Sequence, residues 1–375
     1  MKRCAKLCIF RFLCALFLAV VIFSFTALKS SADENGEYSL IIDDTEELIE
    51  DFNSSLPDGF EKFENISDVS DAIGFEFLLR NIATEIKGER GEFFSFFLLL
   101  FGLSLLLSLA DNIEGEMGSV CKNAVSLVCA LVLFGKMFVL VKNVCVSLEE
   151  INAFFSAMIP IAAAVNLLGL STTTATIQSF GMNMTLQIYS ALGIGILPSF
   201  VGALLAMSAV SSFDNSFLGG MTKSIKHAFM TFIGILTTLI GATFSLQNVI
   251  SSYADTGVIR TAKYALSGMI PIVGSTVSGA FSTLAGGISY AKGVIGGGAI
   301  AVIVAVMIAP LVTLLMYRLC FGVAVFFSEM SSHGGFGMLS SFSSVLDTLI
   351  ATYTLTGVIY IVQLAVFLKG GASLV

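Results

Sequence analysis

Few side chains in this sequence are of the types that do acid–base or nucleophilic chemistry, and their spacing forms no catalytic group. The only two histidines are far apart in sequence: His227 begins an apolar run beside Lys226, and His333 lies in a Gly/Ser-rich turn. Both positions are typical of the edge of a membrane span. Glu149 and Glu150 are adjacent, so a helix points them in different directions and they cannot form a paired acid site. We therefore expect a protein that is not an enzyme.

Two glycine-rich strings look like pieces of catalytic motifs but lack their partners. The string GGG at 296–298 has no Lys and Ser/Thr after it, as a phosphate-binding loop requires, and it lies in an apolar run. HGGFG, which begins at His333, resembles an oxyanion-hole string, but no G-x-S-x-G follows it. Neither string predicts an active site.

The cysteines predict neither a metal site nor a disulfide framework. Three of the seven lie within the first 14 residues, and no pair has the CxxC spacing. The others lie in or beside apolar runs: Cys121, Cys129, Cys145 and Cys320. We interpret these four as small apolar residues of the interior, and we expect no metal and no cofactor.

Composition indicates a membrane protein. The chain has 375 residues, of which 56% are hydrophobic and only 12% are charged, against about 25% charged in a soluble domain. Several apolar runs reach the roughly 20 residues that cross a ~30 Å hydrocarbon core. The fold class is therefore predicted to be an all-α polytopic membrane protein with about six or seven transmembrane or re-entrant helices. There is no basic tract, so nucleic acid is not an expected partner.

The first 32 residues have the order of a secretory signal peptide. A positively charged start precedes an apolar stretch, and Ser30 and Ala32 provide the small residues before a cut ahead of Asp33. The alternative is an uncleaved anchor helix. We predict a signal peptide over 1–32.

An acidic segment follows at 33–92, with 18 acidic and four basic residues. Its apolar residues predict two short amphipathic helices, one of which places Leu48, Ile49 and Phe52 on one side. Sixty residues with so few core candidates would be marginal alone. We predict that this segment is extracytoplasmic and packs on the membrane domain or on a partner.

The remainder, 93–375, is predicted to be the polytopic membrane domain. Charges and small polar clusters divide it into apolar segments at 93–110, 123–146, 151–170, 177–210, 227–246, 294–316 and 346–368. The segment 177–210 is too long for one untilted span, and it contains Gly193, Gly195 and Pro198. It is predicted to be a broken or re-entrant element followed by a full helix. A turn is expected at 254–257.

Charges near the apolar segments supply the candidate interfacial residues. Lys136 lies inside its apolar run, where an ionised Lys at mid-bilayer costs roughly 3 kcal/mol; alternatively the span ends earlier and Lys136 extends to the interface. Arg318 is expected to mark a span boundary. Arg260 and Lys263 suit an interfacial segment, but Lys223 and Lys226 lie on the other side of the intervening span. Both loops are thus basic, and the positive-inside rule leaves the orientation open.

A column of small residues begins after Pro271. On a helix over 273–288, bulky residues fall on one stripe and small residues on a broad face beside it. The small residues at issue are Gly274, Ser278, Gly279, Ser282 and Gly286. In lipid, small faces let helix backbones approach closely, and Gly293 and Gly297 add a GxxxG pair. Two interpretations are open: tight helix packing, within the chain or between copies, and the lining of an aqueous path.

Two strings of this sequence resemble the stage III sporulation protein AE family of endospore-forming bacteria. One is RTAKY, followed by IPIVGSTVSGAFST and AKGVIG, from Arg260 onward; the other is MIPIAAAVNLLGLSTTTATI at 158–177. The resemblance covers about 93 to the C-terminus. The string SGAFSTLAGG is less polar than the family pattern, which weakens a pore role for that face.

The resemblance implies a non-enzymatic membrane subunit of the complex that joins mother cell and forespore after engulfment, a channel or feeding route required for forespore development. Its partners would be other membrane proteins of the same operon and possibly further copies of itself, in the mother-cell-derived outer forespore membrane. The alternative is a stand-alone transporter of a small solute.

Overall fold

The computed structural model describes residues 90–113, 116–168, 172–210, 217–269, 274–330 and 336–369, with short pieces at 50, 52–54, 56 and 87–88. Between 250 and 292 only the backbone is described. Every regular element in these ranges is a helix, and no strand occurs among them. The helices are α5 (Arg90–Asp111), α6 (Glu116–Leu168), α7 (Thr172–Ser190), the π-helix η1 (Ala191–Ile196), α8 (Leu197–Val210), α9 (Phe217–Met269), α10 (Gly274–Met330) and α11 (Phe336–Lys369).

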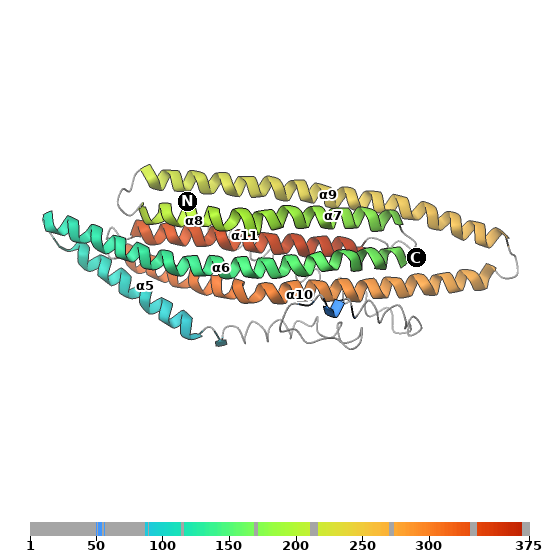
Figure 1. Cartoon of the computed structure of the whole chain (residues 1–375), viewed down its shortest axis with the longest axis horizontal. Coiled ribbons are helices and arrows are strands. Elements are labelled where there is room, and N and C mark those ends of the chain that lie inside the picture. Colours follow the sequence, from blue (N-terminus) through green and yellow to red (C-terminus); the bar gives the residue numbers. More distant parts are fainter. Residues whose placement is uncertain are drawn as a thin grey trace.

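The helices form one elongated antiparallel bundle, in which α11 lies in the interior and α5 crosses one end at an angle (Figure 1). Helix α10 packs against α11, α6 and α5, and α7 packs against α6 and α9. Six stretches within the described ranges are long and apolar enough to cross a membrane: Arg90–Ala110, Gly118–Leu167, Thr173–Val210, Gly220–Gln247, Ile295–Ser328 and Gly337–Leu368. The predicted fold class, an all-α polytopic membrane protein, is confirmed.

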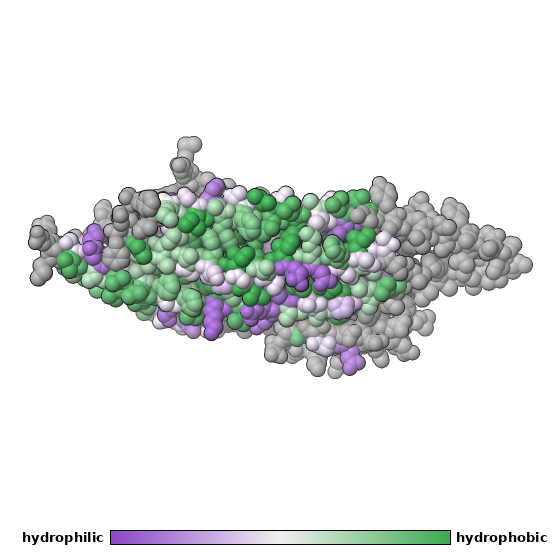
Figure 2. Space-filling model, turned by 45° about the horizontal axis from the view of Figure 1, so that its top comes forward, coloured by the Kyte–Doolittle hydropathy of each residue, from purple (hydrophilic) through white to green (hydrophobic). Residues whose placement is uncertain are grey.

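Large apolar side chains cover much of the outside of the bundle, as expected for a surface in lipid. On α5, Phe94, Leu98, Leu106 and Leu109 are exposed while Leu100 is fully buried. Figure 2 shows a largely hydrophobic face on which hydrophilic residues gather near the middle. Because lipid tails are as apolar as these side chains, helix association depends on close packing and internal polar contacts.

The predicted break between the segments 123–146 and 151–170 is wrong, because α6 is one helix of 53 residues. Glu149 and Glu150 are both exposed, while the neighbouring Leu148 and Ile151 are buried. The two acids therefore occupy the outer face of a continuous helix, and no turn is needed to keep them in water. Similarly, α9 continues through 254–257, where a turn was predicted.

The predicted irregularity in 177–210 is found at its glycines, but the chain does not break or re-enter there. Helices α7 and α8 are joined by the π-helix η1, in which the Leu197 N–H donates to Leu192 O, five residues earlier. Pro198 follows directly; it has no N–H and its ring crowds the preceding turn. A wider turn accommodates these constraints while the helix axis continues.

Glycines let α10 and α11 approach each other closely at two described positions. A Cβ on Gly357 of α11 would lie 1.9 Å from Met307 Sδ of α10, and a Cβ on Gly296 of α10 would lie 2.4 Å from Leu368 Cδ2 of α11. Gly296 lies between Gly293 and Gly297, the predicted GxxxG pair. Small residues thus set the distance between α10 and α11.

A piece of the acidic segment contacts the bundle. Phe52 is buried, and its ring lies edge-on to Phe154 of α6 with the centroids 6.1 Å apart. This agrees with the prediction that Phe52 belongs to an inward-facing side. The predicted signal peptide, Leu48 and Ile49 lie outside the described residues.

Candidate functional site

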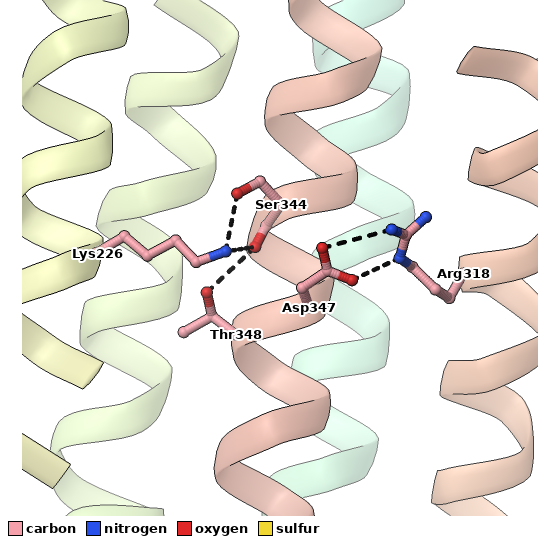
Figure 3. Close-up of polar contacts among 5 residues, drawn as sticks. All are labelled: Lys226, Arg318, Ser344, Asp347 and Thr348. Carbon is pink, nitrogen blue, oxygen red and sulfur yellow. Dashed lines mark hydrogen bonds and ion pairs between the residues drawn. The ribbon is translucent and has the colours of Figure 1, made fainter. Parts of the chain in front are cut away.

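An ion pair joins the C-terminal part of α10 to the first third of α11. Arg318 Nε donates to Asp347 Oδ1 at 2.5 Å, and Arg318 Nη2 donates to Asp347 Oδ2 at 3.4 Å (Figure 3). The two side chains are 30% and 32% exposed, so the pair is partly shielded from water. Arg318 was expected to mark a span boundary, but helix α10 does not end there and continues to Met330. A two-point contact fixes the relative rotation of the two helices.

Lys226 contacts α11 one turn before this pair. Its Nζ donates to Ser344 O at 2.5 Å and to Ser344 Oγ at 2.8 Å (Figure 3). The same carbonyl accepts from Thr348 Oγ1 at 3.1 Å. Lys226 was predicted to lie in a loop, but it belongs to α9 and reaches inward to α11. A cation from α9 and a cation from α10 thus approach α11 on either side of Asp347.

Two further charged residues lie at the same level of the bundle. Lys136 of α6 and Glu92 of α5 line one cavity together with Tyr317, the neighbour of Arg318. We call the five residues from five helices the charged layer: Glu92, Lys136, Lys226, Arg318 and Asp347.

From the charged layer, a row of polar side chains follows α11 through the interior. We call it the polar column: Ser344, Thr348, Thr352, Thr356, Tyr360 and Gln363. All but Ser344 are at most 1% exposed. Each threonine hydroxyl donates to the carbonyl four residues earlier, which satisfies it without a partner from another helix. At 1.5 Å per residue the column is about 28 Å long, close to the thickness of a hydrocarbon core.

The far end of the polar column meets buried amides from other helices. Gln363 Nε2 donates to Gln247 Oε1 of α9, and Thr185 Oγ1 of α7 donates to Gln363 Oε1, both at 3.4 Å. Tyr360 donates its hydroxyl to Asn152 Oδ1 of α6. Asn152 Nδ2 is buried and has no hydrogen-bond partner in the described structure. Such groups are expensive in a membrane interior and are commonly functional.

A second polar contact compensates for a proline in α10. Pro310 lacks the N–H that would otherwise bond Val306 O. Ser147 Oγ of α6 donates to this carbonyl at 3.4 Å, and its hydroxyl also lies 2.7 Å from Tyr353 Oη of α11. Ser147 therefore joins three helices where a backbone bond is missing.

The structure places only some of the predicted site residues. Lys136 is exposed on α6, and the helix does not end there. Its interfacial role stays a prediction. The small residues Gly274, Ser278, Gly279, Ser282 and Gly286 begin α10, as predicted for a helix. Their side chains, and those of Arg260 and Lys263, lie outside the described residues. The role of that face is untested.

Sequence reasoning missed Asp347 and the inward role of Lys226. A signal was present: Asp347 is the single acid in an otherwise uncharged stretch of α11, and Arg318 is the single base in the apolar part of α10. A lone acid and a lone base on neighbouring spans favour a pair. Of the histidines, His227 is exposed on α9 and His333 lies outside the described residues.

The cysteines and carboxylates offer no metal site in the described part of the chain. No group of three or more His, Cys, Asp or Glu side chains could hold an ion there. Cys129 and Cys320 are buried, and Cys121 and Cys145 are partly buried. The four are unbridged.

These features define the class of the protein: a polytopic helical membrane protein with charged and polar groups retained inside its bundle. Residues 58–371 match the family described as stage III sporulation protein AE. The chain belongs to this family, and the resemblance found in its sequence is confirmed. No curated protein and no solved structure matches the chain.

Proposed function

We propose that this sporulation protein is a non-enzymatic membrane subunit of a channel or feeding route between mother cell and forespore, and that forespore development requires it. The family gives the process, stage III of sporulation. The observation that supports a conducting role is the polar column, which extends over about the thickness of a hydrocarbon core. A helix that only anchored a complex would need no such column.

The buried amides strengthen this proposal. Asn152, Gln247 and Gln363 come from α6, α9 and α11 and are at most 7% exposed. Burying an amide in an apolar medium costs several kcal/mol unless it is hydrogen-bonded, and Asn152 Nδ2 has no partner among the described residues. The arrangement suits a bundle that hydrates between α9 and α11 when it joins the complex.

The proposed location is the mother-cell-derived outer forespore membrane. In this arrangement 1–32 is a cleaved signal peptide, 33–92 is an extracytoplasmic segment between the two forespore membranes, and 93–375 is the membrane domain. N-terminal sequencing of the protein from a membrane fraction should find Asp33 first. A chain that retains 1–32 would mean an anchor helix instead.

The proposed partners are other membrane proteins of the same operon, with further copies of this chain possible. The small-residue face formed by Gly274, Ser278, Gly279, Ser282 and Gly286 is proposed to pack against one of them. Small faces allow the close approach on which helix association in lipid depends. The same principle operates between α10 and α11 at Gly357.

The test is to purify the tagged chain from sporulating cells and compare it with the chain made alone and reconstituted in liposomes. We expect it to copurify with membrane proteins of its operon and to pass no solute by itself. If the isolated chain accumulates a solute against a gradient and copurifies with no partner, it is the stand-alone transporter.

A further inference from the structure

A cavity of about 290 Å³ opens on the side of the bundle where α5, α6 and α10 meet. Its polar lining includes Glu92 from the start of α5, Lys136 and Asn143 from α6, and Thr313 from α10. Pro310 lies in the wall, where it interrupts the backbone bonding of α10. The volume is at the small end of the range for ligand sites, about 300–1,000 Å³, so the cavity suits a small polar group.

The cavity is lined by one charge of each sign, Glu92 and Lys136, and the two do not form an ion pair with each other. No ion pair or hydrogen bond joins Glu92 or Lys136 to another residue in the described structure; the ion pair found there is the one between Arg318 and Asp347. Both side chains are exposed, so each remains available to a ligand. A group with a single charge would satisfy one of them and meet the other as a like charge.

The position of the cavity along the bundle favours a ligand at the membrane interface. On one side of the charged layer, α5 continues over 93–110 without a charge, about 27 Å; on the other side, α11 continues over 348–368 without a charge, about 32 Å. Each length matches one hydrocarbon core of ~30 Å. A core beside α5 would place the cavity at its edge, where headgroups and water meet. A core beside α11 would do the same, but α6 exposes Glu149 and Glu150 on that side, so the position beside α5 is favoured.

We propose that this cavity is a binding site for a small zwitterion, an ammonium joined through a short chain to an anionic oxygen group. Glu92 accepts hydrogen bonds from the ammonium, Lys136 donates to the anionic oxygens, and Asn143 and Thr313 provide neutral polar contacts. The headgroup of phosphatidylethanolamine has this chemistry, and so does a free amino acid. The apolar part of the lining, including Val139 and Leu314, would lie along the first carbons of a lipid.

The test uses the full-length protein, purified and delipidated in detergent, and native mass spectrometry to measure binding of short-chain lipids. Dihexanoyl phosphatidylethanolamine should bind at least about tenfold more tightly than dihexanoyl phosphatidylglycerol, which has the phosphate but no ammonium. One charge-assisted hydrogen bond accounts for a factor of about that size. Equal binding of the two lipids would overturn the proposal.

Variants assign the two charges to their roles. Glu92→Gln should weaken phosphatidylethanolamine about tenfold and leave phosphatidylglycerol unchanged or tighter, because only the ammonium loses its partner. Lys136→Met should weaken both lipids about tenfold, because both carry the phosphate. The matched control is Lys142→Met, the same loss of charge at an exposed position of α6 outside the cavity lining. If Lys142→Met has the effect of Lys136→Met, net charge explains the binding and the site is wrong.

A competition arm separates the two sources of the zwitterion. Free glycine and free phosphoethanolamine are added to the complex with the lipid. If the lipid stays bound, the natural ligand is a headgroup; if a free zwitterion displaces it and depends on Glu92 and Lys136 in the same way, the ligand is a solute. Both results support a zwitterion site and differ only in the source.

Discussion

Replacing Ser147 by Ala should destabilise the bundle, because one buried and one partly buried group lose their hydrogen bonds. In the parent protein Ser147 Oγ donates to Val306 O, the carbonyl that Pro310 leaves without its helical partner, and pairs with Tyr353 Oη. Alanine fits the same space, so packing changes little. An unsatisfied buried polar group costs about 1–3 kcal/mol, and we expect a total loss of about 2–3 kcal/mol for Ser147→Ala.

The same substitution should cost less when Pro310 is also changed. In Pro310→Ala the new N–H can donate to Val306 O, so that only Tyr353 is left without a partner when Ser147 is removed. We expect Ser147→Ala to cost about 1 kcal/mol in that background. Adding Tyr353→Phe should remove most of the rest, because replacing both partners of a hydrogen bond by apolar groups of similar shape is nearly neutral.

The assay is reversible unfolding of the purified protein in mixed micelles by increasing SDS, followed by circular dichroism, for the parent, both single variants and the double variant. Independent sites add within about 0.3–0.5 kcal/mol. If Ser147→Ala costs the same in the presence and absence of Pro310, within that margin, Ser147 does not replace the missing backbone bond and the reasoning is refuted.

Three further predictions concern the charged layer and the helix contacts. Arg318→Met and Asp347→Asn should each destabilise the protein in the same unfolding assay. The coupling energy between the two substitutions should be about 1–2 kcal/mol, which lies between the values for exposed and for buried ion pairs. Gly357→Val should cost about 1–3 kcal/mol there, since its side chain overlaps Met307. Enlarging Gly279 to Leu should impair spore formation in a complementation assay without reducing membrane insertion on an immunoblot.

Each of these predictions has a control. Exchanging the charges, with Asp at 318 and Arg at 347, should recover part of the coupling; additive single changes would contradict the ion pair. Gly234→Ala should be tolerated, because nothing lies within 4 Å of a Cβ there, and equal losses at Gly234 and Gly357 would argue against a specific overlap. Phe281→Leu changes a residue of the bulky stripe, and cells that carry it should sporulate normally. If these cells fail to sporulate while cells with Gly279→Leu sporulate normally, the partner packs against the bulky stripe instead.

The fold class and the approximate spans could be predicted because apolar run length is a local property of the sequence. The irregular segment was also found from Gly193, Gly195 and Pro198. The lengths of the helices were predicted wrongly, because each charge was taken as the end of a span. In α6 the acids Glu149 and Glu150 need only an outward face, and a helix can provide one without ending.

The site was harder to predict because it depends on which helices are neighbours. Arg318 and Asp347 are 29 residues apart, and Lys226 is 118 residues from Ser344. Nothing local in the sequence shows that α9, α10 and α11 meet. The four-residue spacing of the threonines in the polar column can be seen in the sequence. A row of threonines that faces lipid and donates to its own helix backbone would have the same spacing, so only the packing shows that this row is buried.

The most direct measurement is exchange of a small membrane-impermeant dye between mother cell and forespore after engulfment, followed by recovery of fluorescence in a photobleached forespore. The proposed conduit predicts recovery in cells with the parent chain and none in cells that lack it. Cells carrying Thr352→Leu and Gln363→Leu should recover more slowly than cells carrying Leu355→Ala, a change outside the polar column. Recovery at the parent rate in cells without the chain would contradict the account.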